Sequence, residues 1–170
     1  NGSEKRPASH QALRLGRDAA PSDIVATRDR MATLATAIRA GEETGTTGST
    51  ITALVQLGIG GSHLGPALAV DALAPFAHPD IKIRFSSSVD ADDLAEALDG
   101  LDPASTLVIA CSKSFTTIET LTALDGALAW LAGGLGDAAI NHVLAVTAAP
   151  ERAKALGVDV NRIYEIPVAV

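Results

Sequence analysis

Two short runs of residues have the composition of phosphate-binding loops. Residues 58–66 read Gly-Ile-Gly-Gly-Ser-His-Leu-Gly-Pro, and residues 112–117 read Ser-Lys-Ser-Phe-Thr-Thr. Each run follows an apolar stretch rich in β-branched residues and leads into a helical pattern, which predicts a strand that turns into a helix. Such a turn directs free backbone N–H groups and the positive end of a helix dipole at one spot. Together the two runs favour a phosphorylated small molecule as the ligand.

The first run is rich in glycine. Gly58, Gly60 and Gly61 permit positive φ angles and let a ligand approach the main chain without Cβ clashes. Ser62 adds a hydroxyl at the expected start of the helix. A dinucleotide site is an alternative, but the third glycine of the Gly-x-Gly-x-x-Gly pattern would fall at His63. No Gly-Lys-Ser/Thr sequence follows either, and a tight turn that needs glycine only for its geometry remains open.

The second run is rich in hydroxyls. Four of them lie within six residues around one lysine: Ser112, Lys113, Ser114, Thr116 and Thr117. A dianionic phosphate can be held by such hydroxyls together with backbone N–H groups and a positive charge. The alternative is an ordinary helix cap, since Ser and Thr favour helix starts. A cap uses one or two such residues rather than four, so the pattern favours phosphate binding.

Outside the two runs, few residues point to chemistry. Glu119 is expected either to orient the second loop or contact a sugar hydroxyl, or to be simply a favourable anion near a helix N-terminus. The four histidines show no metal-ligand spacing, so we expect no metal site. His63 is expected to be a surface residue at the start of a helix. Cys111 lies within an apolar strand pattern and is expected to be a buried, inert thiol.

Composition narrows the class of protein. The chain has 170 residues, enough for one α/β domain, and its 47% hydrophobic content comes from Ala, Leu, Val and Ile rather than from aromatics. That composition suits helices packed on a buried parallel sheet. A formal charge of −7 argues against a nucleic-acid partner. With no run of about 18 apolar residues and no signal-peptide pattern, we expect no membrane partner and a cytoplasmic location.

Apolar periodicity predicts alternating strands and helices. Strands are expected at 51–57, 81–86, 106–111, 141–147 and 162–166. Helices are expected at 23–40 with Ser22 as cap, at 63–74, from 92 with Asp90 as cap, at 116–132, and at 150–157. The alternation implies right-handed crossovers, and therefore a three-layer α/β/α sandwich around a mostly parallel five-stranded sheet. Ligands of such sheets bind at the carboxyl ends of the strands, where both runs fall.

A connector rich in Gly and Thr at residues 41–49 suggests a boundary within the chain. We expect an irregular and helical N-terminal segment over residues 1–45, and a domain over residues 46–170 that carries both loops and is truncated at its C-terminal end. The sequence opens without Met and closes on the apolar run Ile-Pro-Val-Ala-Val, so the chain is expected to be a piece of a longer protein.

The motifs resemble those of the glucose-6-phosphate isomerase family. Residues 58–66 are similar to its Gly-Ile-Gly-Gly-Ser-Asp-Leu-Gly-Pro run, and residues 112–120 resemble its Ser-Lys-Thr-Phe-Thr-Thr-Gln-Glu-Thr. Residues 87–90 are similar to its Ser-Asn-Val-Asp. The opening Asn1, Glu4, Arg6, His10, Ala12, Leu13 and Arg14 fit its Asn-x-Thr-Glu-x-Arg-x-x-x-His-x-Ala-Leu-Arg pattern. The likeness runs along essentially the whole chain, and the two loop motifs are highly specific when found together.

The resemblance implies a flavodoxin-like sugar-isomerase (SIS) domain. The family interconverts glucose 6-phosphate and fructose 6-phosphate through ring opening and a cis-enediol, without metal or nucleotide cofactor. The phosphate pocket it implies comprises Ser112, Lys113, Ser114 and Thr117 with Thr116 beside them, and the implied sugar contacts are Gly61 and Ser62. A homodimer with active sites near the subunit interface is also implied.

The sequence departs from the family pattern at several positions. His63 stands where the family has Asp, Ser88 where it has Asn, Ser114 where it has Thr, and Ile118 where it has Gln. Serine keeps the hydroxyl of threonine, so the phosphate pocket is expected to survive. Loss of the carboxylate at 63 and the amide at 118 indicates a divergent member.

The catalytic groups that the resemblance implies cannot be assigned in this chain. In the family, the glutamate base, the ring-opening His and Lys, and an Arg that stabilises the enediolate come from later segments. A base must lie within hydrogen-bond reach of the proton it moves, so the chain is expected to bind substrate without turning it over. An alternative is a regulatory module that binds a phosphosugar to control a partner. A nucleotide-dependent dehydrogenase is disfavoured by the glycine pattern.

Overall fold

The computed structural model describes residues 10–166 and contains one parallel sheet of five strands. The strands are β1 (Ala53–Leu57), β2 (Lys82–Ser86), β3 (Thr106–Cys111), β4 (Val143–Thr147) and β5 (Ile163–Glu165). Their order in the sheet is β2-β1-β3-β4-β5, which is the flavodoxin-like order of doubly wound folds. The expected parallel five-stranded sheet is confirmed.

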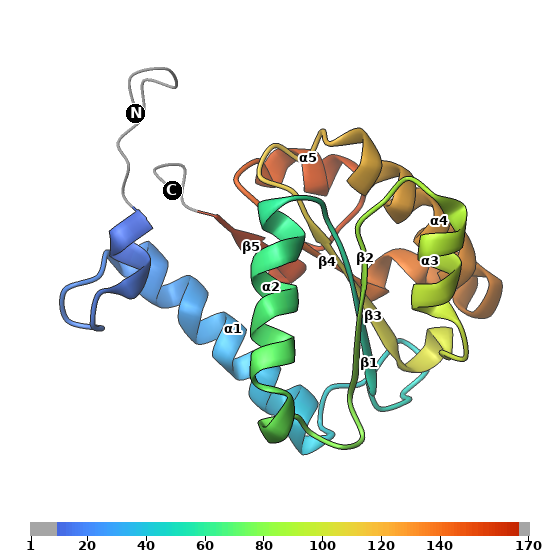
Figure 1. Cartoon of the computed structure of the whole chain (residues 1–170), viewed down its shortest axis with the longest axis horizontal. Coiled ribbons are helices and arrows are strands. Elements are labelled where there is room, and N and C mark those ends of the chain that lie inside the picture. The colour runs from blue at the N-terminus through green and yellow to red at the C-terminus, as the bar shows by residue number, and fades with distance from the viewer. Residues whose placement is uncertain (1–9, 167–170) are drawn as a thin grey trace.

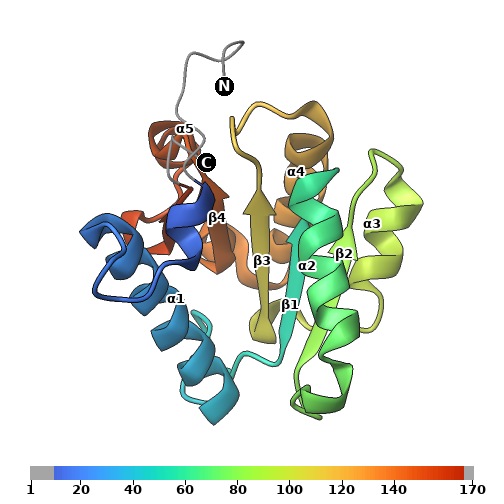
Figure 2. The ribbon, with the colours of Figure 1, turned by 60° about the vertical axis from the view of Figure 1, so that its left-hand side comes forward.

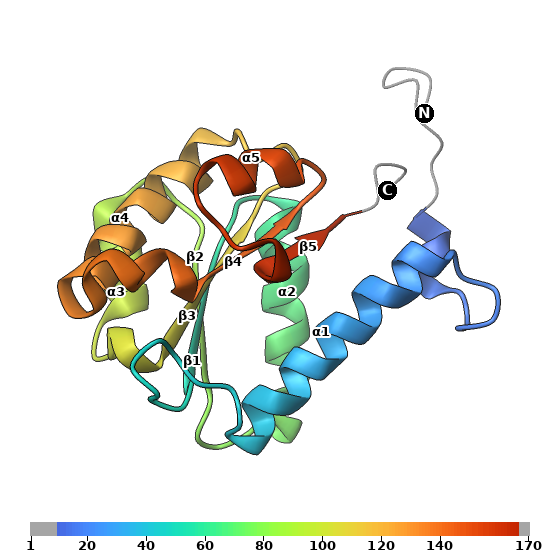
Figure 3. The ribbon, with the colours of Figure 1, turned by 180° about the vertical axis from the view of Figure 1, so that it is seen from behind.

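Helices cover both faces of the sheet (Figures 1 and 3). One face carries α1 (Ser22–Ala40) and α2 (Gly61–Ala72), and the other carries α3 (Ala91–Leu98), α4 (Ile118–Leu135) and α5 (Pro150–Ala155). Short 3₁₀ helices are η1 (His10–Arg14), η2 (Ala74–Phe76), η3 (Pro103–Ser105), η4 (Gly136–His142) and η5 (Val160–Arg162). The three expected layers are therefore present.

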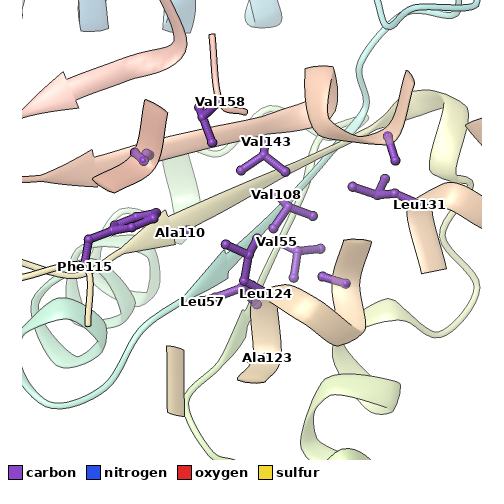
Figure 4. Close-up of a cluster of buried hydrophobic side chains, with 14 of the residues drawn as sticks. Val55, Leu57, Val108, Ala110, Phe115, Ala123, Leu124, Leu131, Val143 and Val158 are labelled. Carbon is purple, nitrogen blue, oxygen red and sulfur yellow. The ribbon is translucent and has the colours of Figure 1, made fainter. Parts of the chain in front are cut away.

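The larger part of the core lies between the sheet and α4. Inward-facing strand residues such as Val55, Val108 and Val143 pack there against Leu124 and Leu131, and none of the five is more than 1% exposed (Figure 4). Strands β3 and β4 are buried on both faces over most of their length, which explains why β3 reads as a continuous apolar run rather than an alternating one.

The other face of the sheet is covered less completely. A second cluster packs Ile38 of α1 against the sheet residues Leu107, Leu144 and Tyr164. None of the residues of α2 is buried, and an apolar groove of about 330 Å³ remains beside α1. The helices α1 and α2 therefore cover their face of the sheet less completely than α3, α4 and α5 cover the other face.

Some expected boundaries were wrong. Pro21 rather than Ser22 occupies the N-cap of α1, so Ser22 is the first helical residue and supplies no side-chain cap. Asp90 does cap α3, because its carboxylate accepts the N–H of Asp92 at 3.0 Å. The fourth strand begins at Val143 rather than at 141, since the two preceding residues belong to η4.

A buried histidine explains that shortened strand. The His142 side chain is fully buried at the end of η4. Its Nε2 accepts the backbone N–H of Thr46 at 3.0 Å, so Nδ1 carries the proton and donates to the carbonyl of Thr106 at 2.9 Å. The ring thus ties the 41–49 connector to the sheet. The division of the chain at residues 45 and 46 stays a prediction.

Among residues 10–166, no helix combines the length and the apolar character needed to cross a bilayer. The same part of the chain holds no group of three or more His, Cys, Asp or Glu side chains arranged to bind a metal ion.

Candidate functional site

The two runs singled out in the sequence lie side by side at the carboxyl edge of the sheet. β1 and β3 are hydrogen-bonded neighbours, and Leu57 at the end of β1 is in register with Ala110 of β3. Both strands run in the same direction, and the segments that follow them lead toward α2 and α4 (Figure 2). Residues 58–62 and 112–117 are therefore brought together by strand pairing.

Glycine is required in the first loop for two physical reasons. A Cβ on Gly58 would lie 2.9 Å from the carbonyl oxygen of Cys111, closer than a real Cβ can approach a backbone atom. Gly60 has φ 54° and ψ −126°, a conformation that side chains rarely adopt. Gly61, where α2 begins, is exposed and has open space where a Cβ would lie. The close packing at Gly58 holds the first loop directly against the end of β3.

The second loop is shaped by its own hydroxyls. Ser112 is 2% exposed, and its Oγ lies 2.9 Å from Oγ1 of Thr117. The same Ser112 Oγ accepts the backbone N–H of Phe115 at 3.1 Å. Phe115 has a positive φ of 50° and a buried ring, so the chain turns sharply before α4 begins. This turn explains why α4 starts at Ile118 and not at 116 as the sequence predicts.

The other hydroxyls of the second loop are more exposed. Ser114 Oγ and Thr116 Oγ1 lie 2.8 Å apart, and Ser114 Oγ also accepts the backbone N–H of Thr116 at 3.3 Å. Lys113 is exposed. The loop therefore presents one hydroxyl pair that is buried at Ser112 and half-buried at Thr117, one exposed pair and a cation.

A cavity of about 1000 Å³ lies between the two loops. It is lined by five of the predicted site residues, namely Ser62, Ser112, Lys113, Ser114 and Thr117. Gly61 and Thr116 belong to the loops but do not line the cavity, and neither does Glu119 in the first turn of α4. The cavity is large enough for a small-molecule ligand.

A third wall of the cavity was missed by sequence reasoning. It is the segment after β4, comprising Ala148, Ala149, Pro150, Glu151 and Arg152. The N–H of Ala148 donates to the carbonyl of Lys113 at 3.0 Å, and Nη1 of Arg152 donates to the carbonyl of Ser114 at 2.6 Å. The position of this segment after the fourth strand could have indicated it, because the carboxyl ends of neighbouring parallel strands share one edge.

Comparison with known proteins places the chain in a family. A family model described as "Phosphoglucose isomerase" matches residues 1–170. The chain belongs to the phosphoglucose isomerase family. A glucose-6-phosphate isomerase of Mycolicibacterium smegmatis is 44% identical over 173 residues, covering 96% of this chain and 32% of the relative. A glucose-6-phosphate isomerase of Rhodococcus opacus is 43% identical over 175 residues, with the same two coverages, 96% and 32%.

A solved structure agrees with the sequence comparison. The crystal structure of a glucose-6-phosphate isomerase from Chlamydia trachomatis matches with a TM-score of 0.70 at 27% identity. The match covers 94% of this chain and 30% of that one. The chain thus spans about a third of the length of the phosphoglucose isomerases that it matches.

The structure shows what surrounds two of the residues that depart from the family motifs. His63 is half-buried rather than a surface residue, because its ring packs edge-on against Phe85 with 5.4 Å between ring centroids. Its Nδ1 is buried without a hydrogen-bond partner. Ile118, at the start of α4, is 74% exposed, so the missing amide there leaves no gap in the core.

Ser88 makes local hydrogen bonds. Its Oγ accepts the N–H of Asp90 at 3.0 Å, and its own N–H donates to Asp93 Oδ2 at 3.2 Å. The same carboxylate oxygen accepts the hydroxyl of Ser86 at 2.7 Å and the N–H of Ser87 at 2.9 Å. Asp93 therefore organises the turn after β2, and serine at position 88 is sufficient for that turn.

Two further side chains line the cavity without having been predicted to. Thr120 is 2% exposed, and its hydroxyl has no hydrogen-bond partner. Cys111 is half-buried, not buried as expected, and faces the same cavity. Desolvation raises the pKa of the Cys111 thiol, and a hydrogen bond with Ser62 opposes that rise only in part.

The raised pKa of Cys111 predicts a slow thiol. We expect iodoacetamide to alkylate the folded chain at pH 8 more slowly than it alkylates free glutathione, because the thiolate is the nucleophile and is scarce below its pKa. The alkylation rate of Cys111 should still rise with pH in the range where the alkylation rate of an ordinary cysteine is already constant. Mass spectrometry after timed quenching measures this, and the chain unfolded in urea is the control. Equal rates for folded and unfolded chain would contradict the prediction.

Proposed function

We propose that the cavity binds the phosphate group of a phosphorylated sugar. One cavity at the starts of α2 and α4 is lined by the hydroxyls of Ser62, Ser112 and Thr117 and by the cation of Lys113. The presence of these four groups in one cavity carries the proposal. Hydroxyls and an ammonium group donate hydrogen bonds to phosphate oxygens, and the helix N-termini favour the negative charge. Ser114 lines the same cavity and adds a further donor.

We also propose that the chain is the phosphosugar-binding part of an enzyme that interconverts glucose 6-phosphate and fructose 6-phosphate. Family membership and the printed names of the relatives support this. The family resemblance implies that the reaction needs neither a metal nor a nucleotide cofactor. It also implies a homodimer, which size-exclusion chromatography with light scattering would test on a protein that includes the other two-thirds of the relatives' length. The cytoplasmic location expected from the sequence stays a proposal.

In this proposal the chain binds the substrate but does not move its proton. Among the described residues that line the cavity, the one carboxylate is Glu151, which is exposed and pairs with Lys154 at 2.6 Å. A general base has to reach the carbon-bound proton within hydrogen-bond distance or through one water. The base that the resemblance implies lies outside this chain. Gly61 and Thr116 then support the two loops from outside the cavity, and Glu119 does so from the first turn of α4.

Ligand-induced stabilisation tests the proposal. 6-Phosphogluconate at about a hundred times its Kd should raise the melting temperature by about 5–10 °C, because a ligand that binds only the folded state stabilises it. Differential scanning fluorimetry measures the shift, and unphosphorylated gluconate at the same concentration is the control. No shift at millimolar 6-phosphogluconate, with the chain folded, would refute phosphosugar binding.

An activity assay on the same sample completes this test. The chain alone should bind fructose 6-phosphate without converting it, which a coupled dehydrogenase assay for glucose 6-phosphate detects. Turnover at the typical enzymatic rate of about 10 s⁻¹ would mean that a base lies within these 170 residues.

A further inference from the structure

Arg152 belongs to the third wall of the cavity, the segment that no sequence motif indicated. It lies in α5, directly after the turn that follows β4, and its side chain is exposed. The same cavity is lined by Ser112, Lys113 and Ser114 of the second loop. A guanidinium group therefore faces the space that the hydroxyls enclose.

The second loop holds this guanidinium in place. Nη1 of Arg152 donates to the carbonyl oxygen of Ser114 at 2.6 Å, which joins α5 to the loop across 38 residues of sequence. The backbone adds support nearby, since Ala148 N–H and Thr147 Oγ1 both donate to the carbonyl of Lys113, at 3.0 and 3.3 Å. One of the five guanidinium N–H donors suffices for the bond to Ser114. Arg152 is thus oriented before any ligand arrives.

Among the described residues, Arg152 supplies one of the two positive charges that line the cavity. Of the described residues that line it, Lys113 and Arg152 are cations and Glu151 is an anion. Glu151 is itself paired with Lys154 at 2.6 Å, so Arg152 adds its charge to that of Lys113 in a chain whose formal net charge is −7. Without Arg152 a dianionic phosphate would meet one lysine on an acidic protein. With Arg152 the cavity carries a net positive charge.

We propose that Arg152 is a second cation that binds the phosphate of the phosphorylated sugar, opposite Lys113. This inference rests on the proposed function and adds to it a residue and a wall of the cavity. Guanidinium groups bind phosphate oxygens through a planar pair of N–H donors, whereas an ammonium group acts as a point charge. The phosphate accordingly contacts the Arg152 side chain in addition to the hydroxyls of the two loops.

Substitutions at Arg152 separate its charge from its hydrogen bond. Arg152→Gln keeps an N–H donor for the Ser114 carbonyl and removes the charge, and it should weaken 6-phosphogluconate binding about tenfold. Arg152→Lys keeps the charge but not the planar pair of donors, and should recover part of that loss. Arg39→Gln is the matched control, because Arg39 is an exposed residue at the far end of α1 and does not line the cavity. Isothermal titration calorimetry measures all four proteins.

Two further measurements distinguish a direct contact between Arg152 and the phosphate from a role in which Arg152 only supports the second loop. Glu151→Gln removes the cavity's carboxylate and should tighten binding about twofold to threefold, a gain that a damaged fold cannot imitate. Added salt should weaken wild-type binding more steeply than binding by Arg152→Gln, because one charge contact fewer is screened.

The outcomes distinguish this inference from the proposed function. If the wild-type chain binds 6-phosphogluconate and Arg152→Gln binds it equally well, Arg152 is not a phosphate ligand and the proposed function stands. Equal losses in Arg152→Gln and Arg152→Lys would also overturn the role of charge. If Arg152→Gln fails to fold, Arg152→Ala takes its place, because Arg152 is exposed on α5, and an affinity equal to that of the wild-type chain decides against the inference. No saturable binding by the wild-type chain would end both proposals.

Discussion

Replacing Ser112 and Thr117 together by alanine is expected to weaken 6-phosphogluconate binding about a hundredfold or more. Each side chain would supply a hydroxyl to the phosphate, and a hydrogen bond to a charged group contributes about 1.5–3 kcal/mol. Both residues line the cavity and their hydroxyls lie 2.9 Å apart, so in the proposed function the pair binds one phosphate. Calorimetric titration of the double variant against the wild-type chain measures the loss.

The fold should tolerate this double substitution. The N–H of Phe115 loses the Ser112 hydroxyl as an acceptor but keeps the Ser112 carbonyl at 3.2 Å. Thr47→Ala with Ser49→Ala is the matched control, because these residues form another Thr–Ser hydroxyl pair, 3.0 Å apart, in the exposed connector. An unchanged affinity in a folded Ser112/Thr117 double variant would place the phosphate elsewhere.

Gly58→Ala is expected both to destabilise the chain and to impair binding. The new methyl group would lie 2.9 Å from the carbonyl oxygen of Cys111 and 3.0 Å from the Cβ of Ser62. A backbone carbonyl inside the sheet cannot move away cheaply, so the first loop has to shift. Overpacking of this kind costs about 1–3 kcal/mol, which lowers the melting temperature of a chain this long by about 2–12 °C.

The binding defect in Gly58→Ala follows from the same shift. Ser62 moves away from Ser112, and 6-phosphogluconate affinity should fall about tenfold, because a displaced donor loses its hydrogen bond to the charged phosphate. Gly65→Ala is the control, since Gly65 lies within α2 and has nothing within 4 Å of the position of a Cβ. Alanine there should leave stability equal or slightly higher. A Gly58→Ala variant as stable as Gly65→Ala would show that the two loops are not tightly packed.

The sequence was sufficient to predict the sheet and the two loops because local signals agree there. Glycine and hydroxyl runs directly follow apolar strands, so the position of 58–62 and 112–117 at one edge follows from parallel pairing alone. Strand order and family membership agree with these expectations. The relatives carry the name of an isomerase, which favours the enzyme over a regulatory module.

The features that sequence reasoning missed depend on contacts between distant segments. Arg152 enters the site through a bond to Ser114, 38 residues earlier in the chain, and no local pattern marks such a partner. The start of β4 is set by His142, whose ring bonds Thr46 and Thr106, far away in sequence. The half-buried position of His63 likewise depends on Phe85 of the neighbouring strand. Tertiary packing, rather than propensity, decides each of these.

A crystal structure of the chain with 6-phosphogluconate tests most directly whether both loops hold one anion. The phosphate is predicted to lie within hydrogen-bond distance of Ser62 in the first loop and of Ser112 and Thr117 in the second. A phosphate that contacts only one loop, or that binds outside the cavity between the two loops, would contradict the shared site.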